Sequence, residues 1–125
     1  ECLLETMRLP GARGAALVDW TSGLALGTVG DPPGGDHETA AAEAAELARL
    51  AAEQHAFGPA DGADSGDPPV EDVILSNRDS YHVLRFVPTS FDSSVFLHLW
   101  LARAEGNLAL ARIRLGEMAG RLELG

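Results

Sequence analysis

The four histidines and the single cysteine have the widest chemical repertoire of the side chains in this 125-residue sequence. Histidine binds metals and transfers protons, and a cysteine thiolate is a nucleophile and a metal ligand. Their spacing fits neither use, because the sequence contains no HExxH, no CxxC and no GxSxG pattern. No arrangement of residues requires an enzyme, although spacing alone does not exclude one. We predict no catalytic residue, no metal site and no cofactor.

Histidine 98 stands in an apolar stretch, where it alternates with Phe96 and Trp100. This pattern favours a neutral, buried histidine with one hydrogen bond over a metal ligand. His37 stands beside Asp36, at the predicted start of a helix, and we expect Asp36 to be the N-cap.

Three aspartates recur at every third position among glycines, at Asp61, Asp64 and Asp67. A calcium-binding loop needs acids at alternate positions and a closing glutamate, and this segment has neither. We expect a flexible acidic loop.

All nine basic residues are arginine. The absence of lysine excludes a P-loop, a protein kinase and Schiff-base catalysis on lysine. The net charge of −10 opposes binding to nucleic acid and to anionic membranes. Twelve acids and one base lie between Asp19 and Asp72, whereas six arginines and five acids follow. The acidic half is either a solvated surface or the face shown to a basic partner.

One cysteine cannot form an internal disulfide, so the sequence gives no sign of an oxidising compartment. No apolar run approaches the roughly 18 residues of a membrane span, and no signal peptide is visible. We expect a soluble, cytoplasmic protein.

The first half of the chain predicts a short helix, a hairpin and a long helix. The helix over Cys2–Leu9 ends at Pro10. Two apolar runs, Gly14–Asp19 and Leu24–Val29, flank a turn in which Gly23 supplies a positive φ. A helix over Asp36–Phe57 then stands between two loops, at residues 30–35 and 58–69.

The long helix has three distinct sides. We expect the bulky residues Leu47, Leu50 and Phe57 to face the core. A charged stripe lies next to them, formed by Glu43, Glu46, Arg49 and Glu53. The third side is alanine, at Ala41, Ala45, Ala48 and Ala52. The alanines reflect either helix propensity or close approach of a second helix across a dimer.

The second half predicts three strands and a last helix. The strands are Val70–Ser76, Tyr81–Val87 and Val95–Ala102, and the third is apolar on both faces, as in a sheet covered on both sides. Asn107 caps the helix, which buries Leu108, Ala111, Leu115, Met118, Ala119 and Leu122 and pairs Glu117 with Arg121 outside. Short loops make each group of strands antiparallel. The prediction is a five-stranded antiparallel sheet between helical layers, an α+β domain.

The run Gly14–Asp19, followed by Gly23-Leu24-Ala25, resembles the opening signature of the Roadblock / dynein light chain family. The segment Gly106–Arg112 resembles that family's entry into its last helix. The resemblance covers about residues 3–122, in the order α-β-β-α-β-β-β-α. It implies a single profilin-like domain over residues 1–125, with one long helix on one face of the sheet and two helices on the other. The chain departs from the pattern at Thr21 and Ser22, where the family often has an acid, and in its long acidic loop.

The resemblance implies a non-enzymatic, homodimeric or heterodimeric adaptor that binds a small Ras-like GTPase and modulates its nucleotide cycle or localisation. The strand Val70–Ser76 would join two copies, through Val73 and Leu75, and the long helices would pack through Ala41, Ala45, Ala48 and Ala52. Under this hypothesis Ala48→Glu separates the copies. From charge and topology, the partner-binding residues would be Glu43, Glu46, Arg49 and Glu53. The alternative is a small-molecule sensor of a related three-layer fold, with a pocket lined by Phe96, His98 and Trp100.

Overall fold

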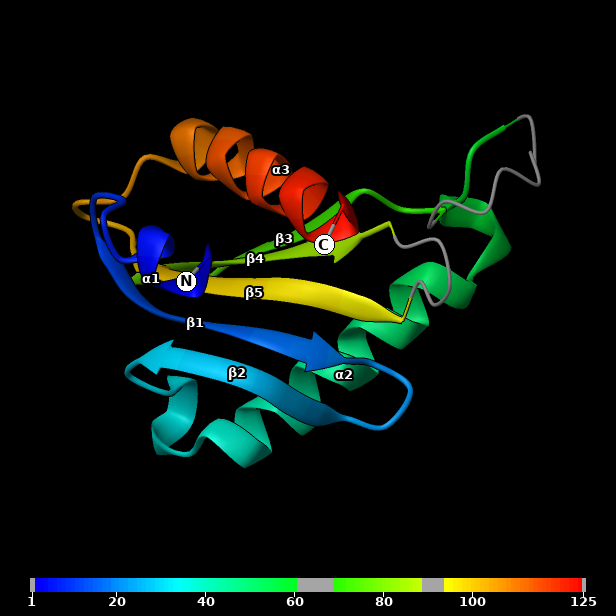
Figure 1. The fold of residues 1–125 in the computed structure, drawn as a ribbon, viewed down its shortest axis with the longest axis horizontal. Coiled ribbons are helices and arrows are strands. Elements are labelled where there is room, and N and C mark those ends of the chain that lie inside the picture. Colours follow the sequence, from blue (N-terminus) through cyan, green and yellow to red (C-terminus); the bar gives the residue numbers. More distant parts are fainter. Residues whose placement is uncertain (1, 61–68, 89–93, 125) are drawn as a thin grey trace.

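The computed structural model describes residues 2–60, 69–88 and 94–124, which form one five-stranded sheet and three α-helices (Figure 1). The elements follow in the predicted order: α1 (Cys2–Thr6), β1 (Ala12–Asp19), β2 (Leu24–Gly30), α2 (His37–Glu53), β3 (Asp72–Ser76), β4 (Ser80–Val87), β5 (Val95–Ala102) and α3 (Leu108–Leu124). Short 3-10 turns lie at Pro33–Gly35 and His55–Phe57. The predicted loop acids Asp61, Asp64 and Asp67 lie outside the described residues.

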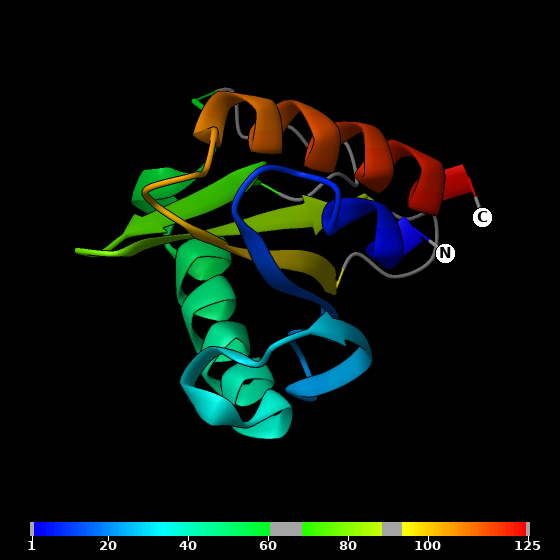
Figure 2. The ribbon, with the colours of Figure 1, turned by 90° about the vertical axis from the view of Figure 1, so that its left-hand side faces the viewer.

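The sheet has the strand order β2-β1-β5-β4-β3, and every neighbouring pair is antiparallel. Helix α2 crosses one face, while α3 and the short α1 lie on the other (Figure 2). Strand β5 is in the middle, and its residues are buried on both faces, as its sequence predicts. The three-layer α+β architecture is therefore confirmed.

The hairpin of β1 and β2 and the start of α2 follow local signals. Gly23 has a φ of +78°, which lets the chain reverse between the two strands. The Asp36 carboxylate accepts a hydrogen bond from the Thr39 N–H at 2.9 Å, so Asp36 is the N-cap of α2. Both expectations are confirmed.

The side of α2 that faces the sheet is the alanine side, and this corrects the sequence analysis. Ala48 is fully buried, whereas Leu50 and Phe57 are 57% and 67% exposed. Of the three predicted core residues, only Leu47 is partly buried against this cluster. The reason is the face of the sheet beneath α2, where the rings of Phe86 and Phe96 fill the layer between sheet and helix. Only small side chains fit beneath a helix that packs so closely. The alanines that meet the sheet are Ala41, Ala44, Ala45 and Ala48.

The opposite face is covered by α3. The Asn107 side chain accepts a hydrogen bond from the Leu110 N–H at 3.0 Å and caps the helix as expected. Leu115 and Met118 are buried against the sheet, in one cluster with Leu97 and Leu99 of β5. The two helical layers therefore cover separate hydrophobic clusters, one on each face of the sheet.

Candidate functional site

The two outer strands of the sheet differ in how readily they accept another strand. Strand β2 carries a bulge that leaves Leu26 without a partner in β1, and it ends at Gly30 with a φ of +75°. Strand β3 pairs regularly with β4 over its whole length, from Asp72 to Ser76. Bulges protect sheet edges from edge-to-edge pairing, so β3 is the edge that is open to a further strand.

The start of β3 is fastened to α3. Asp72 is the first residue of the strand, and its side chain is 12% exposed. Its carboxylate accepts a hydrogen bond from Arg112 Nε at 2.9 Å and lies 3.9 Å from Arg85 Nη1. A charged side chain on an edge strand can prevent pairing with another strand, but the Asp72 carboxylate points inward and instead holds β3 against α3.

An apolar groove lies between β3 and the side of α2 that faces this edge. It has a volume of about 570 Å³. Leu50 and Phe57 are exposed there, and Leu75 of β3 is 41% exposed. Large apolar side chains gathered beside an open strand mark a protein–protein contact surface. We call this surface the β3 groove; its lining residues are Leu47, Leu50, Ala51, Gln54, Phe57, Val70, Asp72 and Val73.

The predicted partner-binding residues all lie on α2, and their role stays a prediction. Arg49 is held within the chain: it donates to the Trp20 carbonyl at 3.0 Å and pairs with Glu46 at 3.3 Å. It thereby ties the β1–β2 turn to α2, beside the Trp20 ring that meets Phe86 edge-on at 6.4 Å. Glu46 and Glu53 are exposed on the side of α2 nearer this turn. We call Glu46, Arg49 and Glu53 the acidic stripe.

Glu43, the fourth residue of that prediction, is exposed next to the β3 groove. It precedes Leu47 by four residues and Leu50 by seven, and these spacings place it on their side of the helix. Glu43 is therefore a neighbour of the β3 groove, and it also stands three residues before Glu46 of the acidic stripe.

Two histidines make contact under the N-terminal part of α2. His82 Nδ1 and His98 Nε2 are 2.9 Å apart, so one ring donates a hydrogen bond to the other. Burial, with the neighbouring His82, lowers the pKa of His98 to about 4, and burial also lowers the pKa of His82. The expectation of a neutral core histidine is confirmed. Among the described residues, no three side chains of the metal-binding types His, Cys, Asp and Glu are grouped so that they could hold a metal ion.

The space beside these histidines is too small for an organic ligand. His82 stacks on Trp100, with ring centroids 6.1 Å apart, and the Arg13 guanidinium lies over the same ring. The crevice next to His98 and Trp100 has a volume of about 10 Å³, which is the room that one water molecule needs. Phe96 does not line it. The geometry at the predicted sensor pocket therefore gives the sensor alternative no support.

No family model and no curated protein matches the amino-acid sequence. Solved structures are similar in fold. A Roadblock/LC7 domain from Streptomyces avermitilis is 19% identical, with a TM-score of 0.73 over 97% of this chain and 91% of that one. Myxococcus xanthus MglB is 16% identical, with a TM-score of 0.74 over 95% and 80%. MglC from the same organism is 20% identical, with a TM-score of 0.62 over 98% and 94%.

The chain has the Roadblock/LC7 fold. The recognition made from the hairpin residues and from the element order is confirmed at this level. Among the described residues, no helix is long and apolar enough to cross a membrane.

Within the Roadblock fold, the predicted dimer residues separate into two groups. Val73 and Leu75 lie on the open edge strand, as expected, and their role stays a prediction. Ala41, Ala45 and Ala48 are 2% exposed or less within the single chain, so they cannot contact a second copy, and Ala52 packs beside them. The signal that could have shown this is the crowding of aromatic residues in β4 and β5, which leaves little room for the helix that covers them.

Proposed function

We propose that the protein is a non-enzymatic, dimeric adaptor that binds a small Ras-like GTPase and modulates its nucleotide cycle or its localisation in the cytoplasm. The observation that carries this proposal is the regular, open edge of β3 with an apolar groove beside it, in a chain of Roadblock fold. The resemblance in sequence supports it independently, because it implies a dimer that joins through this strand.

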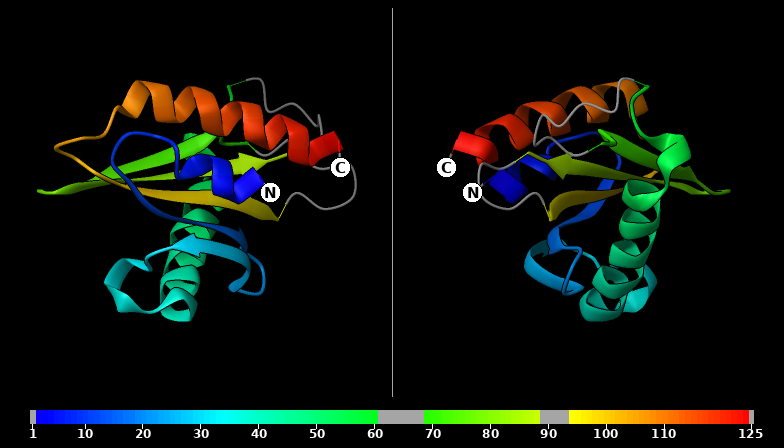
Figure 3. Two further views of the ribbon diagram at one scale, coloured as in Figure 1. Left: turned by 60° about the vertical axis from the view of Figure 1, so that its left-hand side comes forward. Right: turned by 90° about the vertical axis from the view of Figure 1, so that its right-hand side faces the viewer.

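The proposed dimer joins β3 to β3 of a second copy and packs α2 against α2. Leu50 and Leu47, rather than the alanines, supply the helix contact, because they are the apolar residues of α2 that border the open edge. Figure 3 shows α2 on one side of the sheet, and in the proposed continuous sheet both copies of α2 lie on that side. The contact covers Leu50, Phe57 and Leu75, which a single chain leaves exposed.

Leu50→Lys is expected to convert the dimer into monomers. The side chain is 57% exposed in the single chain, so the substitution leaves the fold intact but places a charge in the apolar contact. Light scattering is expected to give a mass near 13.1 kDa for the variant and near twice that value for the unmodified chain. Ile113→Lys is the matched control, because Ile113 is 58% exposed on α3, on the other side of the sheet. Monomer formation by both variants, or by neither, contradicts the β3 contact.

The acidic stripe is the proposed surface for the GTPase. Glu46 and Glu53 project from the layer opposite α3, next to the hairpin turn that Arg49 holds in place. Their charge complements a basic patch on the partner. In a dimer joined through β3, the two stripes lie on one side of the sheet.

The variant Glu46→Arg with Glu53→Arg is expected to weaken GTPase binding by roughly ten-fold or more while the mass of the dimer is unchanged. The measurement is calorimetric titration with the small GTPase encoded nearest the gene, in its diphosphate and triphosphate forms. Glu105→Arg, an exposed charge reversal on the loop before α3, is the control. Binding that is equally strong in the double variant would move the partner surface elsewhere.

A further inference from the structure

The two helical sides of the molecule carry opposite charge. Helix α2 carries four glutamates and one arginine: Glu38, Glu43, Glu46 and Glu53, with Arg49. On the side of α1 and α3 the described residues include three carboxylates, from Glu5, Asp72 and Glu117, and four exposed guanidiniums, from Arg8, Arg112, Arg114 and Arg121. Both views in Figure 3 show α2 and α3 on opposite sides of the sheet. A chain with a net charge of −10 therefore has one side on which arginine predominates.

The basic side is hollowed between α1 and α3. The groove has a volume of about 870 Å³, with Leu9, Leu110 and Met118 among its apolar lining residues. Three arginines and two glutamates also line it: Arg8, Arg114 and Arg121, with Glu5 and Glu117. We call it the α1–α3 groove. Its lining combines an apolar surface with guanidinium groups, and this combination suits an amphipathic segment that carries carboxylates.

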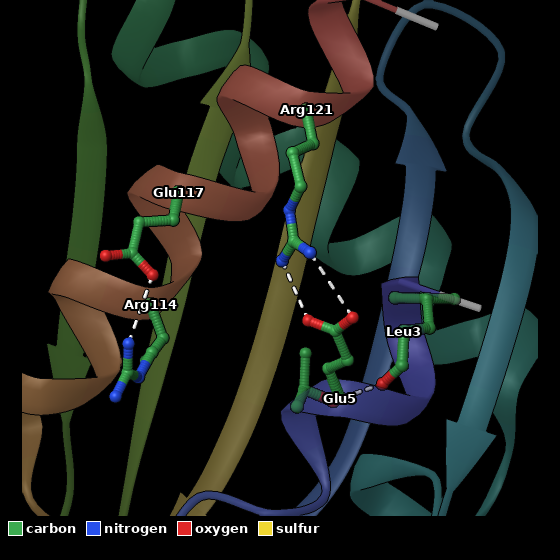
Figure 4. Close-up of polar contacts among 6 residues, drawn as sticks. Leu3, Glu5, Arg114, Glu117 and Arg121 are labelled. Atoms are coloured by element: carbon green, nitrogen blue, oxygen red, sulfur yellow. Dashed lines mark hydrogen bonds and ion pairs between the residues drawn. The ribbon is translucent and has the colours of Figure 1, made fainter.

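An ion pair joins the two walls of the α1–α3 groove. Arg121 donates to both Glu5 carboxylate oxygens, at 2.7 and 3.3 Å (Figure 4). The sequence-based pair of Glu117 with Arg121 was wrong: Glu117 accepts from Arg114 at 3.2 Å instead. At Gly120 an added Cβ would meet nothing within 4 Å, so this part of the lining is unobstructed.

The spacing of the arginines on α3 matches that of the acids on α2. Arg114 and Arg121 are seven residues apart, and so are Glu46 and Glu53. Seven residues are two helical turns, or about 10.5 Å along the axis. We propose that α2 of one chain docks into the α1–α3 groove of a second copy, so that Glu46 and Glu53 face Arg114 and Arg121.

The present partners of these charges can be exchanged. The side chains of the pairs Arg114–Glu117 and Arg121–Glu5 are about half exposed, and Glu46 beside Arg49 is 66% exposed. Exposed pairs of this kind contribute little stability and are screened by salt. Arg8 supplies a third guanidinium for the two incoming carboxylates. The contact is therefore weak and strongly salt-dependent.

This contact differs in kind from the β3 contact. It joins two different surfaces, so each docked chain still offers a free helix at one end and a free groove at the other, and the assembly is open-ended. The β3 edge is not part of it, so dimers joined through β3 can also associate with one another, with α2 of one dimer in the α1–α3 groove of the next; we call this stacking. If the acidic stripe also receives the GTPase, as proposed above, stacking and GTPase binding exclude each other; this consequence alone depends on the proposed function.

Sedimentation velocity of the full chain, with no GTPase present, tests the proposal. At about 20 mM NaCl the mass is expected to rise with protein concentration beyond that of the dilute protein, and at about 500 mM NaCl this rise is expected to disappear. A mass that does not depend on protein concentration at low salt overturns the proposal. This measurement does not depend on GTPase binding. A negative result therefore contradicts stacking but not the proposed GTPase binding, and the reverse is also true.

Charge reversal identifies the two surfaces. Glu46→Arg with Glu53→Arg makes the helix basic, and Arg8→Glu with Arg114→Glu makes the groove acidic. For each variant alone, the association constant of stacking is expected to fall by about ten-fold or more, because like charges then face each other. A mixture of the two is expected to regain stacking, since each basic surface again meets an acidic one. Glu105→Arg is expected to stack like the unmodified chain. Mixed variants that stay apart, or a groove variant that stacks normally, contradict the docking.

Discussion

Ala48→Glu is expected to unfold the chain rather than to separate two copies. Ala48 is fully buried, in the cluster formed with Leu84, Phe86 and Phe96 of the sheet. A glutamate there overfills the layer and brings in a carboxylate without a partner, and the two effects together cost roughly 4 kcal/mol or more. Such a loss is a large part of the 5–15 kcal/mol that typically stabilises a domain. Urea denaturation followed by circular dichroism measures it.

Ala42→Glu is the matched control for this substitution. Ala42 lies on the same helix but is exposed, so the same chemical change is expected to alter the free energy of unfolding by less than about 0.5 kcal/mol. The alternative outcome is an Ala48→Glu protein that folds with normal stability and only loses half of its mass. That result would place the alanine side at a contact between copies and contradict the packing of α2.

Several elements could be predicted because their signals are local. The bounds of β5 agree with its apolar run, Val95–Ala102, and two faces of buried side chains need two covering layers. Asp36 and Asn107 cap α2 and α3 because an N-cap acts within three residues of itself. The turn at Gly23 could also be predicted, because it involves only Gly23 and its neighbours in the sequence.

The orientation of α2 could not be predicted in the same way. Periodicity separates the sides of a helix but does not show which side meets the sheet. That depends on Phe86 and Phe96, which follow Ala48 by 38 and 48 residues and fill the space below it. Bulky residues of a helix face the core only where the layer beneath the helix has space for them. In this protein Phe86 and Phe96 fill the layer between the sheet and α2, so Leu50 and Phe57 are exposed.

The candidate surfaces depend on contacts between distant segments. Glu5 and Arg121 are 116 residues apart, and the local alternative, Glu117 with Arg121, was wrong because α1 lies across the groove. The burial of His98 was predictable from its neighbours, but its partner was not. His82 lies opposite Trp100 and His98 opposite Leu84, so the two histidines meet diagonally through the register of β4 and β5.

Lowering the pH from 7 to 5 is expected to remove about 2 kcal/mol of folding stability through His98. The pKa of His98 falls from 6.5 to about 4 in the folded chain, where the ring is buried against His82. The unfolded chain therefore binds more protons between these two values, and stability decreases as the pH falls through this window. The His82 pKa is also lowered, and it adds to the effect in the same direction.

Three carboxylates with a lowered pKa titrate below pH 5. Asp19, Asp36 and Glu5 have pKa values held below 3.8 or 4.5 by hydrogen bonds from Thr21, Thr39 and Arg121, so they stay ionised from pH 7 to 5. His98→Leu is expected to flatten the stability profile between these pH values, and His55→Asn, at an exposed site, to leave its slope unchanged. Urea denaturation at each pH gives the slopes. An equally steep profile in His98→Leu would show that the acid sensitivity arises elsewhere, and that the two rings are not a neutral pair whose protonation opposes folding.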